Sequence, residues 1–257
     1  MRRRDILVAG PALALAGLPI DMAEAKTESF TVSGRVALDA YRGLVEEHLA
    51  GVLIALKALA ATADVQSGEW DRARPALATL ADGVPTEAAF WLAQPDGDYR
   101  NTANDLSEGN LKDRDYFAGL MAGKPVEGSA VVSKATGHRA IIVAAPVRRN
   151  ETVVAAVGAS LRARLIAELV EKRTAVPDDL VFYALDAKGQ AVIHKDPDLM
   201  FQFPSDIGDA SLKSAVATIL STDEGTVEYT FRGTSRTALF DKSEATGWHF
   251  VLAQVRR

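Results

Sequence analysis

An internal repeat constrains the fold of this 257-residue chain more than any other feature of its sequence. Segment 182–189 (FYALDAKG) follows segment 90–97 (FWLAQPDG) at a spacing of 92 residues. Each segment is an apolar strand that ends in a polar turn with a final Gly. A short strand, a helix and three strands follow each segment in the same order. This predicts two small antiparallel sheets with attached helices, whereas the alternative is one α+β domain whose turns coincide by chance.

The elements of both copies follow from periodicity and turn residues. In the first copy we expect strands over 88–93, 98–102, 129–133, 139–147 and 152–161, and helices over 115–122 and 162–172. In the second copy we expect a strand over 182–185, a short strand ending at His194, a helix over 211–220 and three strands from Gly225 to Val251. The predicted fold class is therefore α+β.

A long helix over 33–63 precedes the first copy. Leu38, Val45, Val52 and Leu59 recur every seven residues and form one apolar stripe on it. Such a stripe packs against its own domain or forms the seam of a homodimer, and the sequence leaves both open. A second helix is predicted over 69–81.

The amino terminus has the pattern of an export signal. Three arginines at positions 2–4 precede an uncharged, largely apolar run over 6–20, and Ala23-Glu24-Ala25 has the small residues that a signal peptidase reads. We therefore expect a signal peptide over 1–25 and a periplasmic protein. Arg3-Arg4 followed by Asp5, Ile6 and Leu7 also fits a twin-arginine signal, while an ordinary secretory signal and an uncleaved anchor are the alternatives.

Composition argues against several classes of function. The chain has no Cys, only four His without short helical spacing, and a formal charge of −5, so we expect no metal site and no nucleic-acid partner. Segment 158–162 lacks the second Gly of a nucleophile elbow, and segment 119–125 departs from a phosphate-binding loop. We expect no cofactor and no catalytic residues, hence not an enzyme.

Several segments, taken in order, resemble the double Cache sensor domains of bacterial chemoreceptors and sensor kinases. They are the long helix, 113–117 (DRDYF), Thr136-Gly137, Ala145-Pro146-Val147, 155–161 (AAVGASL) and Gly247-Trp248. The resemblance implies a long N-terminal helix followed by two tandem PAS-like (Cache) domains, each an antiparallel sheet with flanking helices. The expected ranges are an N-terminal helical region over 26–83, a membrane-distal-type domain over 84–174 and a membrane-proximal-type domain over 175–257.

The resemblance also implies a ligand site in the first Cache domain. Members that recognise amino acids carry an Arg and an aromatic pair on the short helix, which Arg114, Tyr116 and Phe117 match here. Those members also carry an acid near the end of the distal sheet, and Ser160 occupies that place. An ammonium group would thus lack its charge partner while a carboxylate keeps its Arg, which favours a small organic anion as ligand.

Other side chains are weaker candidates for this site. Trp91 and Tyr116 are expected to wall it and to donate hydrogen bonds, although single aromatic residues belong to a core more often. Ser133, Lys134, His138 and Arg139 flank a predicted hairpin turn, where they either close over an anion or form a solvated loop. For Arg114 the alternative is a surface salt bridge with Asp113 or Asp115, and we interpret His194 and His249 as structural.

The predicted function is periplasmic sensing or binding of a small molecule. The resemblance extends to about Val255 and the sequence ends about two residues later, so we expect the output to pass through a membrane-bound signalling partner. The alternative is a ligand-independent interaction protein that pairs through its long helix with a membrane kinase, chemoreceptor or transporter.

Overall fold

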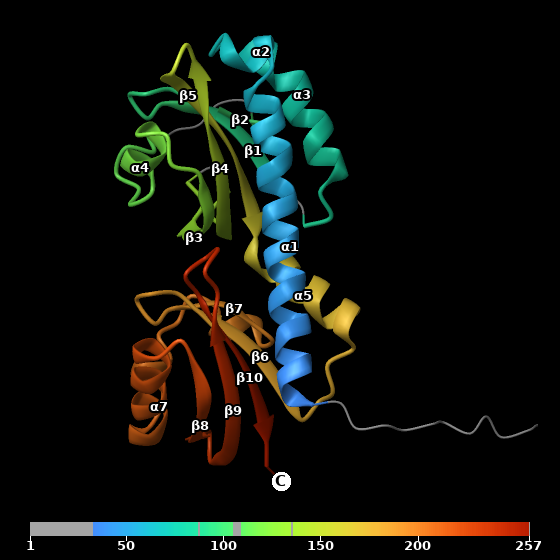
Figure 1. Ribbon diagram of the computed structural model, residues 1–257, viewed down its shortest axis with the longest axis vertical. Coiled ribbons are helices and arrows are strands. Elements are labelled where there is room, and N and C mark those ends of the chain that lie inside the picture. The colour runs from blue at the N-terminus through green and yellow to red at the C-terminus, as the bar shows by residue number, and fades with distance from the viewer. Residues whose placement is uncertain (1–32, 87, 105–108, 135, 257) are drawn as a thin grey trace, which may run out of the picture. The chain divides into compact units, whose positions relative to one another are not determined.

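Two five-stranded antiparallel sheets form the frame of the protein (Figure 1). The first contains β1 (Ala88–Ala93), β2 (Tyr99–Asn101), β3 (Val126–Val132), β4 (Arg139–Arg149) and β5 (Thr152–Arg162). The second contains β6 (Leu180–Leu185), β7 (Ala191–His194), β8 (Glu224–Phe231), β9 (Thr234–Lys242) and β10 (His249–Val255). Their strand orders are β2-β1-β5-β4-β3 and β7-β6-β10-β9-β8, so the two sheets have the same topology.

This computed structural model describes residues 33–86, 88–104, 109–134 and 136–256. The predicted signal peptide over 1–25 lies outside these residues. Among the residues described, no helix combines the length and apolar character needed to cross a membrane. The residues from Val32 onward cluster as one unit, so the predicted boundary between 174 and 175 remains a prediction.

The sequence repeat corresponds to a repeated backbone turn. The N–H of Gly97 donates to the carbonyl of Gln94, and the N–H of Gly189 donates to that of Asp186, both at 2.9 Å. The two glycines have φ angles of 92° and 81°, a region that residues with a Cβ rarely adopt. The final Gly of each copy is therefore required by its turn, which explains why it recurs at the spacing of 92 residues.

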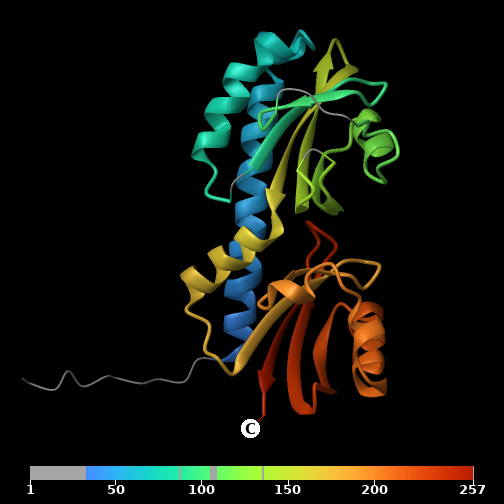
Figure 2. The ribbon, with the colours of Figure 1, turned by 180° about the vertical axis from the view of Figure 1, so that it is seen from behind.

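Helices cover both faces of each sheet (Figure 2). They are α1 (Gly34–Ala60), α2 (Ala63–Gln66), α3 (Trp70–Gly83), α4 (Phe117–Met121), α5 (Ala163–Thr174), the 3₁₀ turn η1 (Pro197–Leu199), α6 (Pro204–Ile207) and α7 (Ala210–Ser221). Side chains of α1, α3 and α5 share one core cluster with residues of both sheets. On the opposite faces, α4 packs on the first sheet and α7 on the second.

At two places a turn shortens a predicted helix. The predicted helix over 33–63 stops at Ala60, because the extended residue Thr62 begins α2 and its side chain accepts a hydrogen bond from the Val65 N–H. The predicted helix over 115–122 shortens to α4, because the Phe117 N–H closes a turn onto the Arg114 carbonyl at 2.9 Å. This turn keeps Arg114 and Tyr116 outside the helix.

The apolar stripe of α1 packs within its own chain. Leu38, Val45 and Val52 are buried in the core that α1 shares with the two sheets. The Tyr41 ring lies 5.1 Å from the ring of Phe182 in the second sheet. The stripe therefore serves the fold, and a homodimer through α1 would have to use another face of the helix.

Candidate functional site

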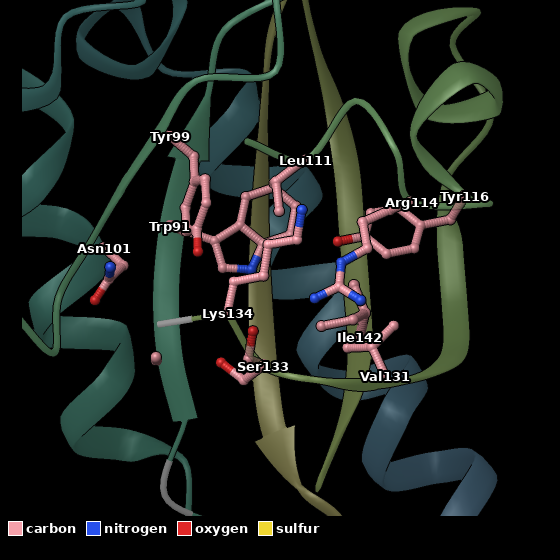
Figure 3. A pocket seen from close by; sticks show the side chains of 12 residues that line it. Trp91, Tyr99, Asn101, Leu111, Arg114, Tyr116, Val131, Ser133, Lys134 and Ile142 are labelled. Atoms are coloured by element: carbon pink, nitrogen blue, oxygen red, sulfur yellow. The ribbon is translucent and has the colours of Figure 1, made fainter. Parts of the chain in front are cut away.

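A cavity lies between the first sheet and the segment that leads into α4. About 320 Å³ of space, with the open solvent at the mouth included, lies between the side chains that line it. Figure 3 shows Trp91 and Tyr99 on one side of the cavity and Arg114 and Tyr116 on the other. The lining residues come from β1 to β5 and from two connecting segments: Ala89, Trp91, Tyr99, Asn101, Leu111, Arg114, Tyr116, Val131, Ser133, Lys134, Ile142 and Ser160.

Six of the eight predicted site residues thus line one cavity. Trp91, Arg114, Tyr116, Ser133, Lys134 and Ser160 come together although they span 70 residues of sequence. His138 and Arg139 are not part of the described lining. His138 is exposed in the hairpin turn, and the Arg139 guanidinium donates to the Pro197 carbonyl at 3.1 Å, next to the second sheet.

Arg114 presents an unused hydrogen-bond donor. Its Nη2 donates to the Val132 carbonyl at 2.7 Å, whereas its Nε is buried and has no partner among the described residues. A buried donor without a partner costs free energy that an anionic acceptor would recover. A ligand carboxylate reaching this Nε would supply the missing acceptor.

The neighbouring aspartates are engaged elsewhere. Asp113 accepts a hydrogen bond from Lys134 Nζ at 2.6 Å, and Asp115 accepts one from Lys188 Nζ at 2.8 Å. Each lysine lowers the pKa of its partner carboxyl below the usual value, chiefly through that hydrogen bond. Within the described part of the chain, Asp113 and Asp115 thus form ion pairs with lysines, and not with Arg114 as the surface salt-bridge alternative requires.

The floor of the cavity depends on the pair Trp91 and Gly158. The two residues lie opposite each other in the register of β1 and β5. A Cβ built on Gly158 would overlap the indole ring of Trp91, so only Gly lets the ring lie flat on β5. Trp91 is 2% exposed and belongs to the small core on the α4 face of the sheet, so it is both a core residue and the floor of the cavity.

Tyr116 forms part of the wall next to α4. Burial raises the pKa of its phenol well above the usual value, although the nearby Arg114 opposes this shift. The hydroxyl therefore stays protonated at neutral pH and remains able to donate a hydrogen bond.

Asn101 also lines the cavity, although the sequence did not predict it as a candidate. Its side chain is fully buried, and its Oδ1 accepts hydrogen bonds from the N–H groups of Ala103 at 2.9 Å and Asn104 at 3.2 Å. These two bonds fix the amide so that its Nδ2 is a second buried donor without a partner among the described residues. The only signal in the sequence was an Asn directly before a turn, which is common in ordinary loops.

The other unpredicted lining residues are Ala89, Tyr99, Leu111, Val131 and Ile142. Most of them are apolar strand residues of a kind that every sheet contains. Their place at the cavity follows from the strand order, in which β2 and β3 are the two edge strands of the first sheet.

The described lining contains two cationic side chains, Arg114 and Lys134, and no carboxylate. Ser160 lies at the place where the sequence resemblance implied an acid. Lys134 is partly neutralised by Asp113, which leaves Arg114 as the main source of positive potential. In the described part of the chain, no group of three His, Cys, Asp or Glu residues is arranged to hold a metal ion.

Comparison with known proteins gives a consistent result. The ligand-binding domain of the Pseudomonas aeruginosa amino acid chemoreceptor PctB, solved with L-Arg, has a TM-score of 0.69 and 14% identity, over 86% of this chain and 93% of that chain. The ligand-binding domain of the Pseudomonas fluorescens chemoreceptor CtaA, solved with L-serine, has a TM-score of 0.67 and 17% identity, with the same coverage of 86% and 93%.

A third similar structure is the sensory domain of the Campylobacter jejuni chemoreceptor Tlp3 with isoleucine bound. Its TM-score is 0.63 with 12% identity, over 86% of this chain and 89% of that chain. At such identities these structures establish the fold alone. A search of curated proteins gives no match.

The sequence also matches a family as a whole. The Cache domain family, in its dCache_1 form, matches residues 31–257, which is nearly all of the chain after the predicted signal peptide. The matched region contains the α1 helix, both sheets and the cavity. The long helix, the two antiparallel sheets of one topology and this match agree, and the chain belongs to the double Cache domain family.

Proposed function

We propose that this protein is a periplasmic sensory or solute-binding protein whose first sheet binds a small organic anion such as a carboxylate. The observation that carries the proposal is the buried, unpaired Nε of Arg114 in a cavity whose described lining has no carboxylate. Asn101 Nδ2 offers a second buried donor in the same lining. Two donors and a cationic side chain favour a ligand that brings acceptors and negative charge.

Because the described lining contains no carboxylate, we expect a ligand of a different class from the amino acids bound in the similar solved structures. PctB and CtaA are described with L-Arg and L-serine bound, and each of these carries an ammonium group beside its carboxylate. Here Ser160 lines the cavity, and a neutral hydroxyl interacts far less strongly with an ammonium than a carboxylate does. We therefore expect simple carboxylates to bind better than amino acids of the same size.

The proposal includes an organisation into two Cache modules. The first sheet would be the membrane-distal-type module over 84–174, and the second sheet the membrane-proximal-type module over 175–257. Contacts between the Asp115 carboxylate and Lys188, at 2.8 Å, link the segment next to Arg114 to the β6–β7 turn of the second sheet. A ligand that reorders Arg114 would thereby act on the second sheet and, through it, on a membrane-bound signalling partner.

The test is a ligand screen with a matched pair of variants. The thermal unfolding midpoint Tm is measured with acetate, lactate, succinate, L-serine and L-arginine at equal ionic strength. A ligand that binds only the folded state raises the Tm, so we expect a carboxylate without an ammonium to give the largest rise. Arg114→Gln should weaken that ligand by about tenfold or more, as expected for loss of a charge-assisted hydrogen bond.

Arg139→Gln is the control, because it removes the same charge from the adjacent hairpin at a residue outside the described lining. If the Arg114 and Arg139 variants bound the carboxylate with equal affinity, Arg114 would not be part of its binding site. A panel in which no carboxylate or amino acid changes the Tm would contradict the proposed function itself.

Export to the periplasm by a cleaved signal over 1–25 is part of the same proposal. It is supported by the basic, apolar and small-residue order of the amino terminus. Amino-terminal sequencing of the protein recovered from the periplasm should start at Lys26, and an intact Met1 start would contradict it.

A second candidate function is ligand-independent pairing through α1. On this helix, Val36 and Ile54 are exposed by 57% and 66% although both are large and apolar. Their face of α1 would contact a membrane kinase, chemoreceptor or transporter, or a second copy of this chain. A complex that is abolished by Ile54→Asp and is indifferent to all ligands would favour this function over sensing.

A further inference from the structure

The second sheet has a pocket of its own on the α7 face. Two hollows, of about 360 and 610 Å³ with open solvent included, share the lining residues His194, Leu199, Phe231 and Arg236. Because of these shared walls we treat them as one pocket. Tyr183, which lines the deeper hollow, is the residue of the second copy that corresponds to Trp91 of the first.

Arg236 is the charged group at the centre of this pocket. It lies on β9 opposite Tyr229 of β8, and its guanidinium carbon is 5.1 Å from the centre of the Phe231 ring. Its Nε is buried and has no hydrogen-bond partner among the described residues. The same unpaired donor therefore occurs here as at Arg114, on an equivalent face of the equivalent sheet.

His194 adds a further donor to the lining. The Asp196 backbone N–H donates to its Nδ1 at 2.8 Å, and the ring stacks on Tyr183 with ring centres 5.6 Å apart. Burial lowers the pKa of His194 to about 4, so the ring is neutral at pH 7. Since Nδ1 accepts a hydrogen bond, we assign the proton of the neutral ring to Nε2, which makes Nε2 a donor.

The other charged side chains around the pocket pair with groups other than Arg236 or lie at its rim. In the outer hollow, the Asp196 carboxylate lies 3.7 Å from Arg232, and Lys195 donates to the carbonyls of Pro177 and Leu180. Glu171 is exposed at the rim. In the described lining of the deeper hollow, Arg236 is the one residue with a permanent charge.

The rest of the deeper lining is largely apolar. Leu199, Pro204, Ile207 and Leu212 contribute to it, and Ile207 remains 44% exposed although it is a large apolar residue. A ligand with an apolar body would cover this surface, and burial of apolar area contributes to binding. The first cavity, by contrast, offers a buried Asn and two Ser beside its aromatic residues.

We propose that this pocket is a second binding site, for a small monocarboxylate with an apolar body. The carboxylate would accept hydrogen bonds from Arg236 and His194, and the body would lie against Phe231, Leu199 and Ile207. This site goes beyond the proposed function, because it belongs to the second sheet and does not depend on Arg114.

The experiment measures binding of acetate, butyrate and benzoate by calorimetry and by Tm, with sodium chloride at the same ionic strength as reference. The proteins are the wild type, Arg236→Gln, Arg114→Gln and the control Lys242→Gln. Lys242 ends the same strand β9 and pairs with Asp223 at 3.0 Å, outside the described lining of the pocket. It therefore controls for the loss of one positive charge.

Butyrate and benzoate should bind the wild type, Arg114→Gln and Lys242→Gln with similar affinity, and more tightly than acetate. Arg236→Gln should weaken them by about tenfold or more. If Arg236→Gln does not fold, Arg236→Lys replaces it, and it should bind measurably more weakly because an ammonium lacks the planar fork of the guanidinium.

Three results would overturn the second site. The first is equal affinity of the Arg236 and Lys242 variants. The second is loss of butyrate binding in Arg114→Gln alone, which would assign the ligand to the first sheet and leave the proposed function standing. The third is the absence of any Tm shift or heat of binding with the three carboxylates, in which case the result of the separate screen on Arg114 still decides the proposed function.

Discussion

Single residues decide the shape of both pockets. Gly158 has no side chain, so the Trp91 indole lies flat on β5 and forms a floor for the first cavity. Arg114 and Arg236 each keep a buried Nε without a partner, although each side chain is held nearby, by the Val132 carbonyl and by the Phe231 ring. Such groups are costly in a folded protein unless a ligand or water satisfies them.

Gly158→Ala should damage the first cavity and the fold together. The added methyl group overlaps the Trp91 ring, which must tilt into the cavity or away from its core. Overpacking of this kind costs about 1–3 kcal/mol in the free energy of unfolding. Urea denaturation measures this cost, and a carboxylate titration of the same variant should show weakened binding.

The matched control is Gly51→Ala in α1, where a Cβ meets no heavy atom within 4 Å. This substitution should stabilise the protein by about 0.5–1 kcal/mol, because Ala favours helix more than Gly does. If both variants were equally stable, the close approach of Trp91 to Gly158 would not be a constraint on the fold.

At the scale of elements, the two faces of α1 have different surroundings. One face is buried against both sheets, and the other keeps Val36 and Ile54 exposed. The seven-residue repeat of the sequence identified the buried face correctly as an apolar stripe, but it could not tell a core from a dimer seam. The choice depends on the partner surface, and both sheets of the same chain provide it.

Two truncations on α1 test this assignment. Leu49→Ala should lower the free energy of unfolding by about 2–5 kcal/mol, because Leu49 is 0% exposed and its removal leaves a cavity in the shared core. Ile54→Ala should change it by less than about 0.5 kcal/mol, as expected at an exposed position. Chemical denaturation of both variants gives the comparison; similar losses would mean that Ile54 is covered in solution, as in a dimer.

At the scale of the whole molecule, stability should depend on pH through buried histidines. His194 has a folded-state pKa of about 4, because burial disfavours its charged form and because Arg236 and Arg232 add positive charge, although Asp196 opposes both effects. Burial also lowers the pKa of His48 and of His249. These rings protonate more readily in the unfolded chain, which has an ordinary His pKa of about 6.5.

The unfolded state therefore binds more protons than the folded state below about pH 6.5, and stability falls as the pH falls towards 4. For His194 the slope reaches about 1.4 kcal/mol per pH unit at most. Urea unfolding between pH 7 and 4.5 measures it, and His194→Gln should flatten the dependence. An unchanged slope in this variant would show that His194 is not the group responsible.

Much of this protein was determined by its sequence alone. The spacing of 92 residues between the two copies predicted two sheets, and their turns at Gly97 and Gly189 share one backbone geometry. Periodicity and turn residues are local signals, so strands and helices were found to within a few residues. The resemblance predicted that Arg114 and Tyr116 are site residues, and both line the first cavity.

Only the tertiary structure decided which distant residues share a pocket. Asn101 joins the first cavity, and Arg236 and His194 meet in the second, because strand order brings separate strands to one face. Whether an Arg keeps an unpaired donor likewise depends on its neighbours in space. Asp113 and Asp115 flank Arg114 in the sequence, but they form ion pairs with lysines far along the chain. Local patterns fix which face of a strand is apolar, but contacts between strands are set by the packing of the whole sheet.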